Sequence, residues 1–111
     1  MSGLLASVRS AAEAGLALQA GADIIDGKDP ADGALGALAP ARLREIVTTI
    51  AGRRPVSATL GNLTADDPAL AERLTATVAS GVDLVKVGLF EPARLPQQLR
   101  ALARLAPRHP M

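Results

Sequence analysis

Short, strongly apolar segments alternate along the chain with longer segments in which apolar residues recur every three or four positions. Continuous apolar runs are typical of buried parallel strands, and the wider spacing is typical of helices that cover a sheet. The predicted strands are Leu4–Val8, Ala22–Asp26, Pro55–Gly61 and Val82–Leu89. Each predicted strand is followed by one amphipathic helix, so the pattern indicates four strand–helix units.

Capping residues mark where the predicted helices begin and end. Ser10 and Glu13 have the spacing of a capping box, which opens a first helix that ends before Gly21. The second helix is predicted from Pro40 to Gly52, the third from Asp67 and Pro68 to Gly81, and the fourth from Pro96. The apolar residues expected to face the sheet are Leu43, Ile46, Val47 and Ile50, then Leu70, Leu74 and Val78, then Leu99, Leu102 and Leu105, while Arg100 and Arg104 are expected in water.

This order of elements indicates an α/β fold in which a parallel sheet is covered by helices. A complete TIM (β/α)₈ barrel needs about 250 residues. The 111 residues are therefore predicted to form a single domain over residues 1–111 that supplies about half of such a barrel. An internal repeat supports the prediction, because AGADIIDGK and SGVDLVKVG share the pattern small, glycine, apolar, aspartate and two apolar residues.

The repeat places Asp26 and Lys86 at equivalent positions on the second and fourth strands. Side chains from alternate strands share a layer inside a barrel, so both are expected at one level, with Lys28 on the same side of its strand as Asp26. Ten of the 12 basic residues are Arg, and Lys28 and Lys86 are the only lysines. Schiff-base formation needs a lysine amine, which arginine cannot supply. The pattern indicates a lysine site at the C-terminal mouth with Asp26 moving protons; alternatively, each lysine reaches water or pairs with a carboxylate such as Asp29.

Four further residues are candidates for substrate binding. Ser7 and Arg9, at the end of the first strand, are placed to reach a substrate phosphate, although Arg9 is equally suited to solvating the helix start. Ser57 and Thr59 share a face of the third strand and are candidates for hydrogen bonds to substrate. Small hydroxyls that fill a barrel layer are the alternative for this second pair.

Composition narrows the classes of function. Phe90 is the only aromatic residue and the formal charge is +1, so the chain has neither a stacking platform nor an excess of basic surface for nucleic acid. The absence of cysteine excludes disulfides and fits a reducing, cytoplasmic location. Arg9 and Glu13 interrupt the first apolar segment, so neither a signal peptide nor a membrane anchor is expected there. His109 is the only histidine, and no metal or cofactor is predicted.

Four segments carry a family resemblance: SVRSAAEA, GADIIDGKDPADGALGA, VSATLGN and VDLVKVGLF. Over essentially the whole chain they resemble the (5-formylfuran-3-yl)methyl phosphate synthase family, also called 4-(hydroxymethyl)-2-furancarboxaldehyde-phosphate synthase. The most specific stretch is residues 26–37, which satisfy the motif Asp, any, Lys, Asn or Asp, Pro, two variable residues, Gly, small, Leu, Gly, Ala.

The resemblance implies an aldolase-like barrel that condenses two molecules of glyceraldehyde 3-phosphate, eliminates one phosphate and water, and closes the furan ring of methanofuran. It places the Schiff-base lysine at Lys28, the acid–base aspartate at Asp26 and a second barrel lysine at Lys86. An iminium at Lys28 would serve as the electron sink for deprotonation and phosphate loss, with Asp26 and Lys86 moving protons or holding a phosphate.

Three departures from the family pattern bear on activity. Gly27 replaces a β-branched or larger residue, which would loosen the strand end, and Asn62 stands where the family tends to have Asp. The family's remaining catalytic Asp and Lys, with its main phosphate site, come from later strands that these four units do not supply. The chain is therefore expected to pair with a second copy or with a missing C-terminal half.

Two other functions remain open from the sequence. A related barrel lyase acting on phosphorylated sugars would use Asp26 and Lys86 for enolisation without an imine. A non-catalytic half-barrel would serve only as a folding or assembly module, and the open apolar edges of its first and fourth strands would require association.

Overall fold

The computed structural model describes residues 3–32, 36–63, 66–89 and 91–105. It contains one four-stranded sheet in the order β1-β2-β3-β4, and every neighbouring pair of strands is parallel. The strands are β1 (Leu5–Val8), β2 (Ile24–Gly27), β3 (Val56–Thr59) and β4 (Leu84–Lys86), and the helices are α1 (Ala11–Gln19), α2 (Pro40–Ile50), α3 (Pro68–Ala79) and α4 (Leu95–Leu105). Two single-turn 3₁₀ helices, η1 (Pro30–Asp32) and η2 (Pro92–Arg94), follow β2 and β4. The predicted α/β class and parallel sheet are confirmed.

The first three helices begin where the capping residues predicted, and α4 begins at Leu95, one residue before the predicted Pro96. The Ser10 hydroxyl accepts a hydrogen bond from the Glu13 amide at 3.2 Å, and Asp67 accepts one from the Ala69 amide at 2.8 Å. The return bond of the first cap differs from the standard capping box, because Glu13 Oε1 accepts from the amide of Arg9 at 2.7 Å rather than from the cap residue itself. The α1 start is therefore tied to the end of β1.

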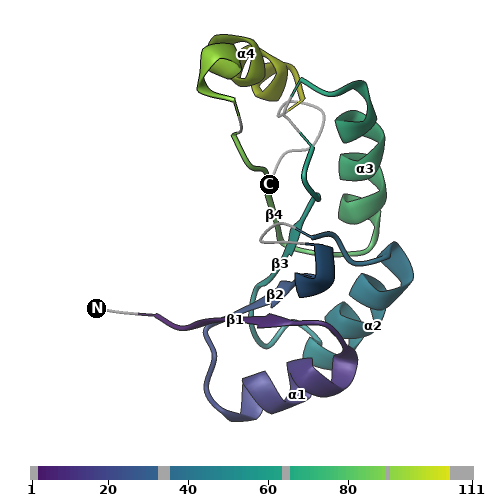
Figure 1. The fold of residues 1–111 in the computed structure, drawn as a ribbon. Coiled ribbons are helices and arrows are strands. Elements are labelled where there is room, and N and C mark those ends of the chain that lie inside the picture. The colour runs from purple at the N-terminus through teal and green to yellow at the C-terminus, as the bar shows by residue number, and fades with distance from the viewer. Residues whose placement is uncertain (1–2, 33–35, 64–65, 90, 106–111) are drawn as a thin grey trace.

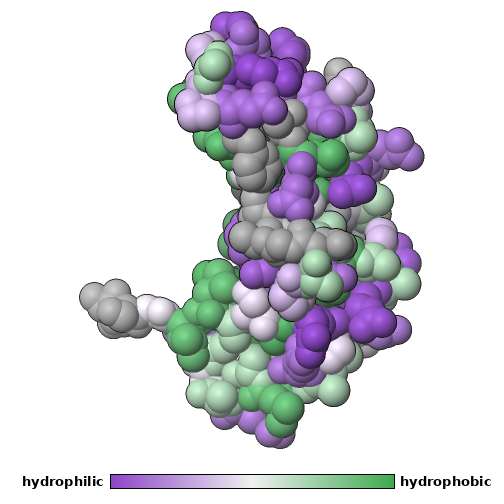
Figure 2. Space-filling view, viewed as in Figure 1, coloured by the Kyte–Doolittle hydropathy of each residue, from purple (hydrophilic) through white to green (hydrophobic). Residues whose placement is uncertain are grey.

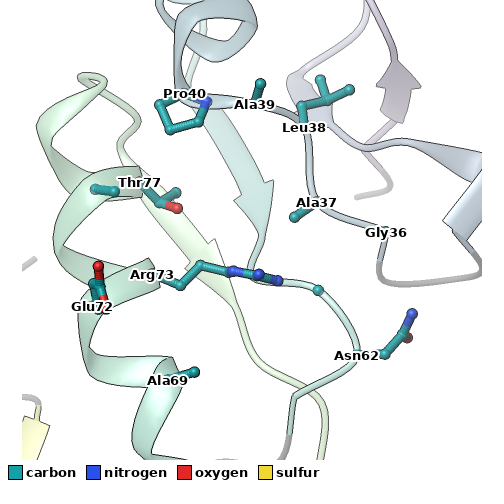
Figure 3. Close-up of a pocket in the computed structure, with 12 residues that line it drawn as sticks. Gly36, Ala37, Leu38, Ala39, Pro40, Asn62, Ala69, Glu72, Arg73 and Thr77 are labelled. Carbon is teal, nitrogen blue, oxygen red and sulfur yellow. The ribbon is translucent and has the colours of Figure 1, made fainter.

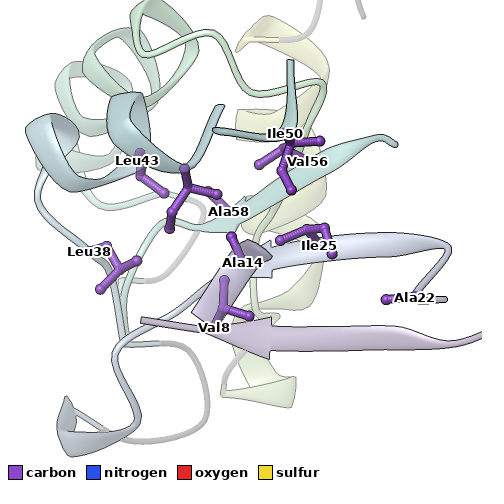
Figure 4. Close-up of a cluster of buried hydrophobic side chains, with 10 residues drawn as sticks. Val8, Ala14, Ala22, Ile25, Leu38, Leu43, Ile50, Val56 and Ala58 are labelled. Carbon is purple, nitrogen blue, oxygen red and sulfur yellow. The ribbon is translucent and has the colours of Figure 1, made fainter. Parts of the chain in front are cut away.

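The main core lies between one face of the sheet and helices α1 and α2. Buried side chains from the first three strands meet those of both helices in this cluster (Figure 4). Its buried members are Val8, Ala14, Ala22, Ile25, Leu38, Leu43, Ile46, Ile50, Val56 and Ala58. A second, smaller cluster joins Leu60 to Leu70 and Leu74 of α3. The stripes predicted for α2 and α3 therefore face the sheet, with Val47 and Val78 half-buried.

Two aspartates of the internal repeat play the same structural role. Asp23, just before β2, accepts a hydrogen bond from the amide of Leu4 at 2.7 Å. Asp83, just before β4, accepts one from the amide of Val56 at 2.9 Å. Each even-numbered strand therefore fixes the beginning of the odd-numbered strand beside it.

Two expectations about the C-terminal part are wrong. The last strand contains Leu84–Lys86 rather than Val82–Leu89, because only three residues of this edge strand pair with β3. Leu99 is 49% exposed, whereas Gln98 and Ala101 are buried and Leu102 is half-buried. The buried stripe of α4 is thus shifted by one residue, and the side chain of Leu105 lies outside the described part. Arg100 and Arg104 are exposed, as predicted.

No helix of the described residues packs against the other face of the sheet, whose central side chains are buried and whose edges are exposed. In Figure 1, α1, α2 and α3 lie along one side of the sheet, and α4 lies beyond the end of β4. Leu5 on β1 and Leu84 on β4 are each 45% exposed, and they belong to the two edge strands. Figure 2 shows hydrophobic surface gathered over β1 and α1, beside the hollow side of the molecule. We call the uncovered side of the sheet the open face.

Candidate functional site

A carboxylate lies at the centre of the open face. Register pairs Ser7 of β1 with Asp26 of β2, and Asp26 with Ser57 of β3, so the three side chains form one row across the sheet. Asp26 is fully buried; its Oδ1 accepts from Ser57 Oγ at 2.7 Å and its Oδ2 from Ser7 Oγ at 3.2 Å. The sequence placed Ser7 and Ser57 near the site but missed that both hydroxyls donate to Asp26.

Lys86 forms an ion pair with this carboxylate. Its Nζ lies 2.9 Å from Asp26 Oδ2, and 38% of its side chain remains exposed. The pair brings together the two residues that the repeat placed at equivalent positions. A buried carboxylate with two hydroxyl donors and one ammonium has its charge compensated on both oxygens.

Lys28 follows β2 directly, and its backbone is fixed on one side by β1. Its amide donates to the Val8 carbonyl at 3.1 Å. Its side chain is half-buried and makes no hydrogen bond or ion pair with any residue that the structure describes. The two lysines of the chain therefore differ: Lys86 is engaged by Asp26, whereas the Lys28 amine has no partner within the described part of the chain.

Gly27 lies in close contact with Leu43 where β2 meets α2. A Cβ atom at this position would lie 2.5 Å from Leu43 Cδ2, well inside the shortest contact that carbon atoms tolerate. Leu43 is itself buried, so its side chain occupies the space that a larger residue 27 would need. Gly27 is therefore closely packed against α2, and the loosening expected from glycine stays a prediction.

Thr59 anchors Gly36 next to the residue that follows Lys28. Its buried hydroxyl donates to the Gly36 carbonyl at 2.7 Å, and the Asp29 amide donates to the same oxygen at 2.9 Å. Asp29 in turn accepts from the Ala31 amide at 3.0 Å through its side chain, so it caps the turn and does not pair with Lys28. The Gly36 carbonyl therefore links the residue after Lys28 to the end of β3.

Arg9 is engaged at the start of α1. Its guanidinium lies 3.3 Å from Glu13 Oε2, and both side chains are well exposed. Hydrogen bonds from the Arg9 amide and guanidinium lower the pKa of Glu13 below its ordinary value of 4.5. These contacts match the helix-start role weighed for Arg9, and its role at a substrate phosphate stays a prediction.

A cavity of about 670 Å³ lies between the start of α2, the end of β3 and one face of α3. Figure 3 shows Arg73 extending from α3 toward the segment at Gly36 and Asn62. Arg73 also donates to the Leu60 carbonyl at 3.2 Å. Neither lysine lines this cavity. It was not foreseen from the sequence, because it depends on how α2 and α3 diverge.

No group of three or more His, Cys, Asp or Glu side chains that could hold a metal occurs among the described residues. His109 lies outside them. Within the same part of the chain, no helix combines the length and apolar character that crossing a membrane requires.

Comparison with known proteins assigns the family. The model of the 4-HFC-P synthase family matches residues 4–110. The chain belongs to this family. A provisionally named (5-formylfuran-3-yl)methyl phosphate synthase of Methylorubrum extorquens is 48% identical over 78% of the chain and 36% of its own length. The (5-formylfuran-3-yl)methyl phosphate synthase of Methanosarcina mazei is 36% identical over 92% of the chain and 44% of its own length.

Relative to these 4-HFC-P synthase family members, the chain spans less than half of their length. Among solved structures, the one titled "PhdJ bound to substrate intermediate" matches with a TM-score of 0.60 at 20% identity, over 95% of this chain and 41% of that chain. At this identity the likeness concerns the fold alone.

Proposed function

We propose that the protein acts in the synthesis of (5-formylfuran-3-yl)methyl phosphate, through a Schiff base between Lys28 and glyceraldehyde 3-phosphate. The single observation that carries the proposal is the difference between the two lysines. Lys86 is held by Asp26 at 2.9 Å, whereas the side chain of Lys28 has no partner among the described residues. A nucleophilic amine must have its lone pair available, and Lys28 meets this requirement better than Lys86.

The proposed first step balances as an ordinary imine formation. Lys28 Nζ attacks the aldehyde carbon, the carbonyl oxygen leaves as water, and the iminium then draws electrons from the neighbouring carbon. Asp26 accepts the proton released from that carbon, and Lys86 holds the carboxylate in place or contacts a substrate phosphate. Condensation of a second glyceraldehyde 3-phosphate, loss of one phosphate and water, and ring closure would follow. The cysteine-free composition fits action in the reducing cytoplasm.

We further propose that the sheet is half of a TIM barrel and is closed by a second copy or by further strand–helix units. Ser57 pairs with Leu84, yet Asp26, level with Ser57, contacts Lys86 two residues further along β4. An eight-stranded barrel with a shear of eight has a stagger of about one residue per strand, which fits this two-residue offset across two strands. Sedimentation analysis tests the closure, and a soluble monomer with an open sheet would contradict it.

Borohydride trapping tests the Schiff base. The chain is incubated with glyceraldehyde 3-phosphate, reduced, and examined by intact mass and peptide mapping, beside Lys28→Arg and Lys86→Arg variants. We expect an adduct on Lys28 that persists in Lys86→Arg and disappears in Lys28→Arg, because arginine keeps the charge but cannot form the imine.

The other outcomes separate the competing functions. Substrate-dependent proton exchange without an adduct would indicate enolisation by Asp26 and Lys86. A folded chain that neither traps nor exchanges, alone or with a longer relative's C-terminal half, would indicate an assembly module.

A further inference from the structure

Two buried hydroxyls of β3 have partners that connect them separately to the two lysines. Ser57 is 2% exposed and donates to Asp26, which holds Lys86. Thr59 is 1% exposed and donates a hydrogen bond to the Gly36 carbonyl. The same carbonyl accepts a hydrogen bond from the amide of Asp29, the residue after Lys28. Each hydroxyl hydrogen is therefore already used within the protein, which leaves only acceptor capacity for a substrate.

We propose that Ser57 and Thr59 are positioning residues, and that β3 sets the two lysines independently. Ser57 fixes the orientation of the Asp26 carboxylate, so that its second oxygen faces Lys86. Thr59 fixes Gly36, which binds the residue after Lys28, so that the amine of Lys28 stays at the end of β2. These positioning roles rest on the proposed function. They take the place of the substrate contacts that the sequence suggested for Ser57 and Thr59.

The hydrogen bonds that Asp26 accepts support the positioning role of Ser57. Asp26 Oδ2 has two donors, Ser7 and Lys86, whereas Ser57 is the donor found for Oδ1 among the described residues. Without the Ser57 hydroxyl the terminal torsion of Asp26, which is soft for aspartate, is restrained through Oδ2 alone. The expected result is a weaker hold on Lys86, with the backbone of Lys28 unaffected.

Thr59 acts on the backbone near Lys28 rather than on a side chain. Lys28 is tied to β1 through its own amide, and the next residue is tied to Gly36. Thr59 is the side chain of β3 that anchors Gly36, at 2.7 Å in a buried position. Loss of this hydroxyl removes one of two donors from the Gly36 carbonyl and weakens the anchor beside Asp29 and Lys28, while the bonds of Asp26 remain.

The acetylation rates of Lys28 and Lys86 test the roles of Ser57 and Thr59 separately, without an activity assay. Limiting N-hydroxysuccinimide acetate forms an amide at each lysine Nζ with release of N-hydroxysuccinimide, and peptide mapping gives the separate rates of Lys28 and Lys86. Ser57→Ala should raise the rate of Lys86 about fivefold and leave Lys28 unchanged, which corresponds to one lost hydrogen bond. Thr59→Val, which is nearly isosteric, should raise the rate of Lys28 by a similar factor and leave Lys86 unchanged.

Matched variants separate positioning from simple destabilisation. Thr75→Ala removes an exposed hydroxyl that donates to the Ala71 carbonyl at 3.0 Å on α3, and both lysine rates should stay at the wild-type level. Ser57→Thr and Thr59→Ser keep the hydroxyl and should restore wild-type rates. Equal acceleration of both lysines in Ser57→Ala or Thr59→Val, or no acceleration in folded variants, would overturn the proposal.

The positioning roles and the proposed function fail in different ways. Trapping of glyceraldehyde 3-phosphate by Lys28 with no selective change in acetylation would remove the roles of Ser57 and Thr59 and keep the enzyme. Selective acetylation changes without any trapping in the wild type would keep the positioning network and remove the Schiff base.

Discussion

Lys86 and Asp26 form an ion pair at 2.9 Å although 60 residues separate them in the chain. Lys86 is level with Thr59 in the strand register, so its side chain reaches back along the open face to the row of Asp26. The two partners differ in burial: the carboxylate is 0% exposed, whereas 38% of the lysine side chain is in water. The pair is therefore asymmetric, and losing one partner does not equal losing the other.

Lys86→Met should destabilise the fold more than Asp26→Asn. Methionine leaves a buried carboxylate with only hydroxyl donors, and an uncompensated buried charge costs about 3–5 kcal/mol. Asn at position 26 leaves an ammonium that can turn to water, so the cost is about 1–2 kcal/mol. Urea unfolding of both variants at neutral pH gives the order, and the double variant gives the coupling. The opposite order would show that the carboxylate, not the lysine, is the partner with access to water.

Gly27→Val should destabilise the junction of β2 and α2. The new side chain overlaps Leu43 Cδ2, which lies 2.5 Å from the position of a Cβ atom, and overpacking of this kind costs about 1–3 kcal/mol. Leu43→Ala alone should cost about 2–5 kcal/mol through the cavity that it leaves. Combined in one chain, the two changes should cost less than the sum, because each occupies or vacates the same space. Additive costs in chemical denaturation would rule out the overlap.

Gly15→Ala should stabilise the protein. Gly15 lies inside α1, and a Cβ there would meet no atom within 4 Å. Replacement of glycine by alanine in a helix interior gains about 0.5–1 kcal/mol. The matched substitution Gly81→Ala should be destabilising, because Gly81 has φ +96° and its Cβ would lie 3.2 Å from Val47. Thermal unfolding of the pair should move the midpoint in opposite directions.

The hydrogen bonds that Glu13 accepts at the start of α1 should make stability depend on pH in the acid range. The pKa of Glu13 is lowered in the folded protein, first by the hydrogen bond from the Arg9 amide, so its ionised form stabilises the native state. This contribution is complete above the unfolded value near 4.5 and is lost as pH falls through the lower folded value. Glu13→Gln should therefore be less stable than wild type at neutral pH, with the difference shrinking toward zero in strong acid. A constant difference at all pH values would contradict this linkage.

Much of the fold was predictable because its signals are local. Ser10, Pro40 and Asp67 mark helix starts through backbone hydrogen bonds or a fixed φ, and these depend on adjacent residues only. The Leu99 error arose because Leu99 and Gln98 lie on neighbouring stripes of α4. Which of the two side chains is buried depends on tertiary contact: Gln98 donates a hydrogen bond to the Glu91 carbonyl at 3.4 Å. Such contacts leave no periodic signal.

For the site, the repeat predicted that Asp26 and Lys86 approach each other, but not what surrounds them. Ser7 and Ser57 meet Asp26 only because three strands align in one register, and the sequence alone does not fix register between strands that lie far apart in the chain. The packing of Leu43 against Gly27 likewise depends on where α2 crosses β2. The sequence therefore identified the residues of the site but did not predict the strand register and helix packing that bring them into contact.

The aspartates that precede β2 and β4 give the chain a modular construction. Asp23, before β2, accepts a hydrogen bond from the residue that precedes β1, and Asp83, before β4, accepts one from the first residue of β3. Each pair of strands is therefore joined by an aspartate hydrogen bond of its own. Arg53 and Arg54 lie exposed between these two modules. A chain divided there should yield two fragments that each retain their aspartate contact and recombine across β2 and β3, which makes this junction the natural point for splitting or circularly permuting the protein.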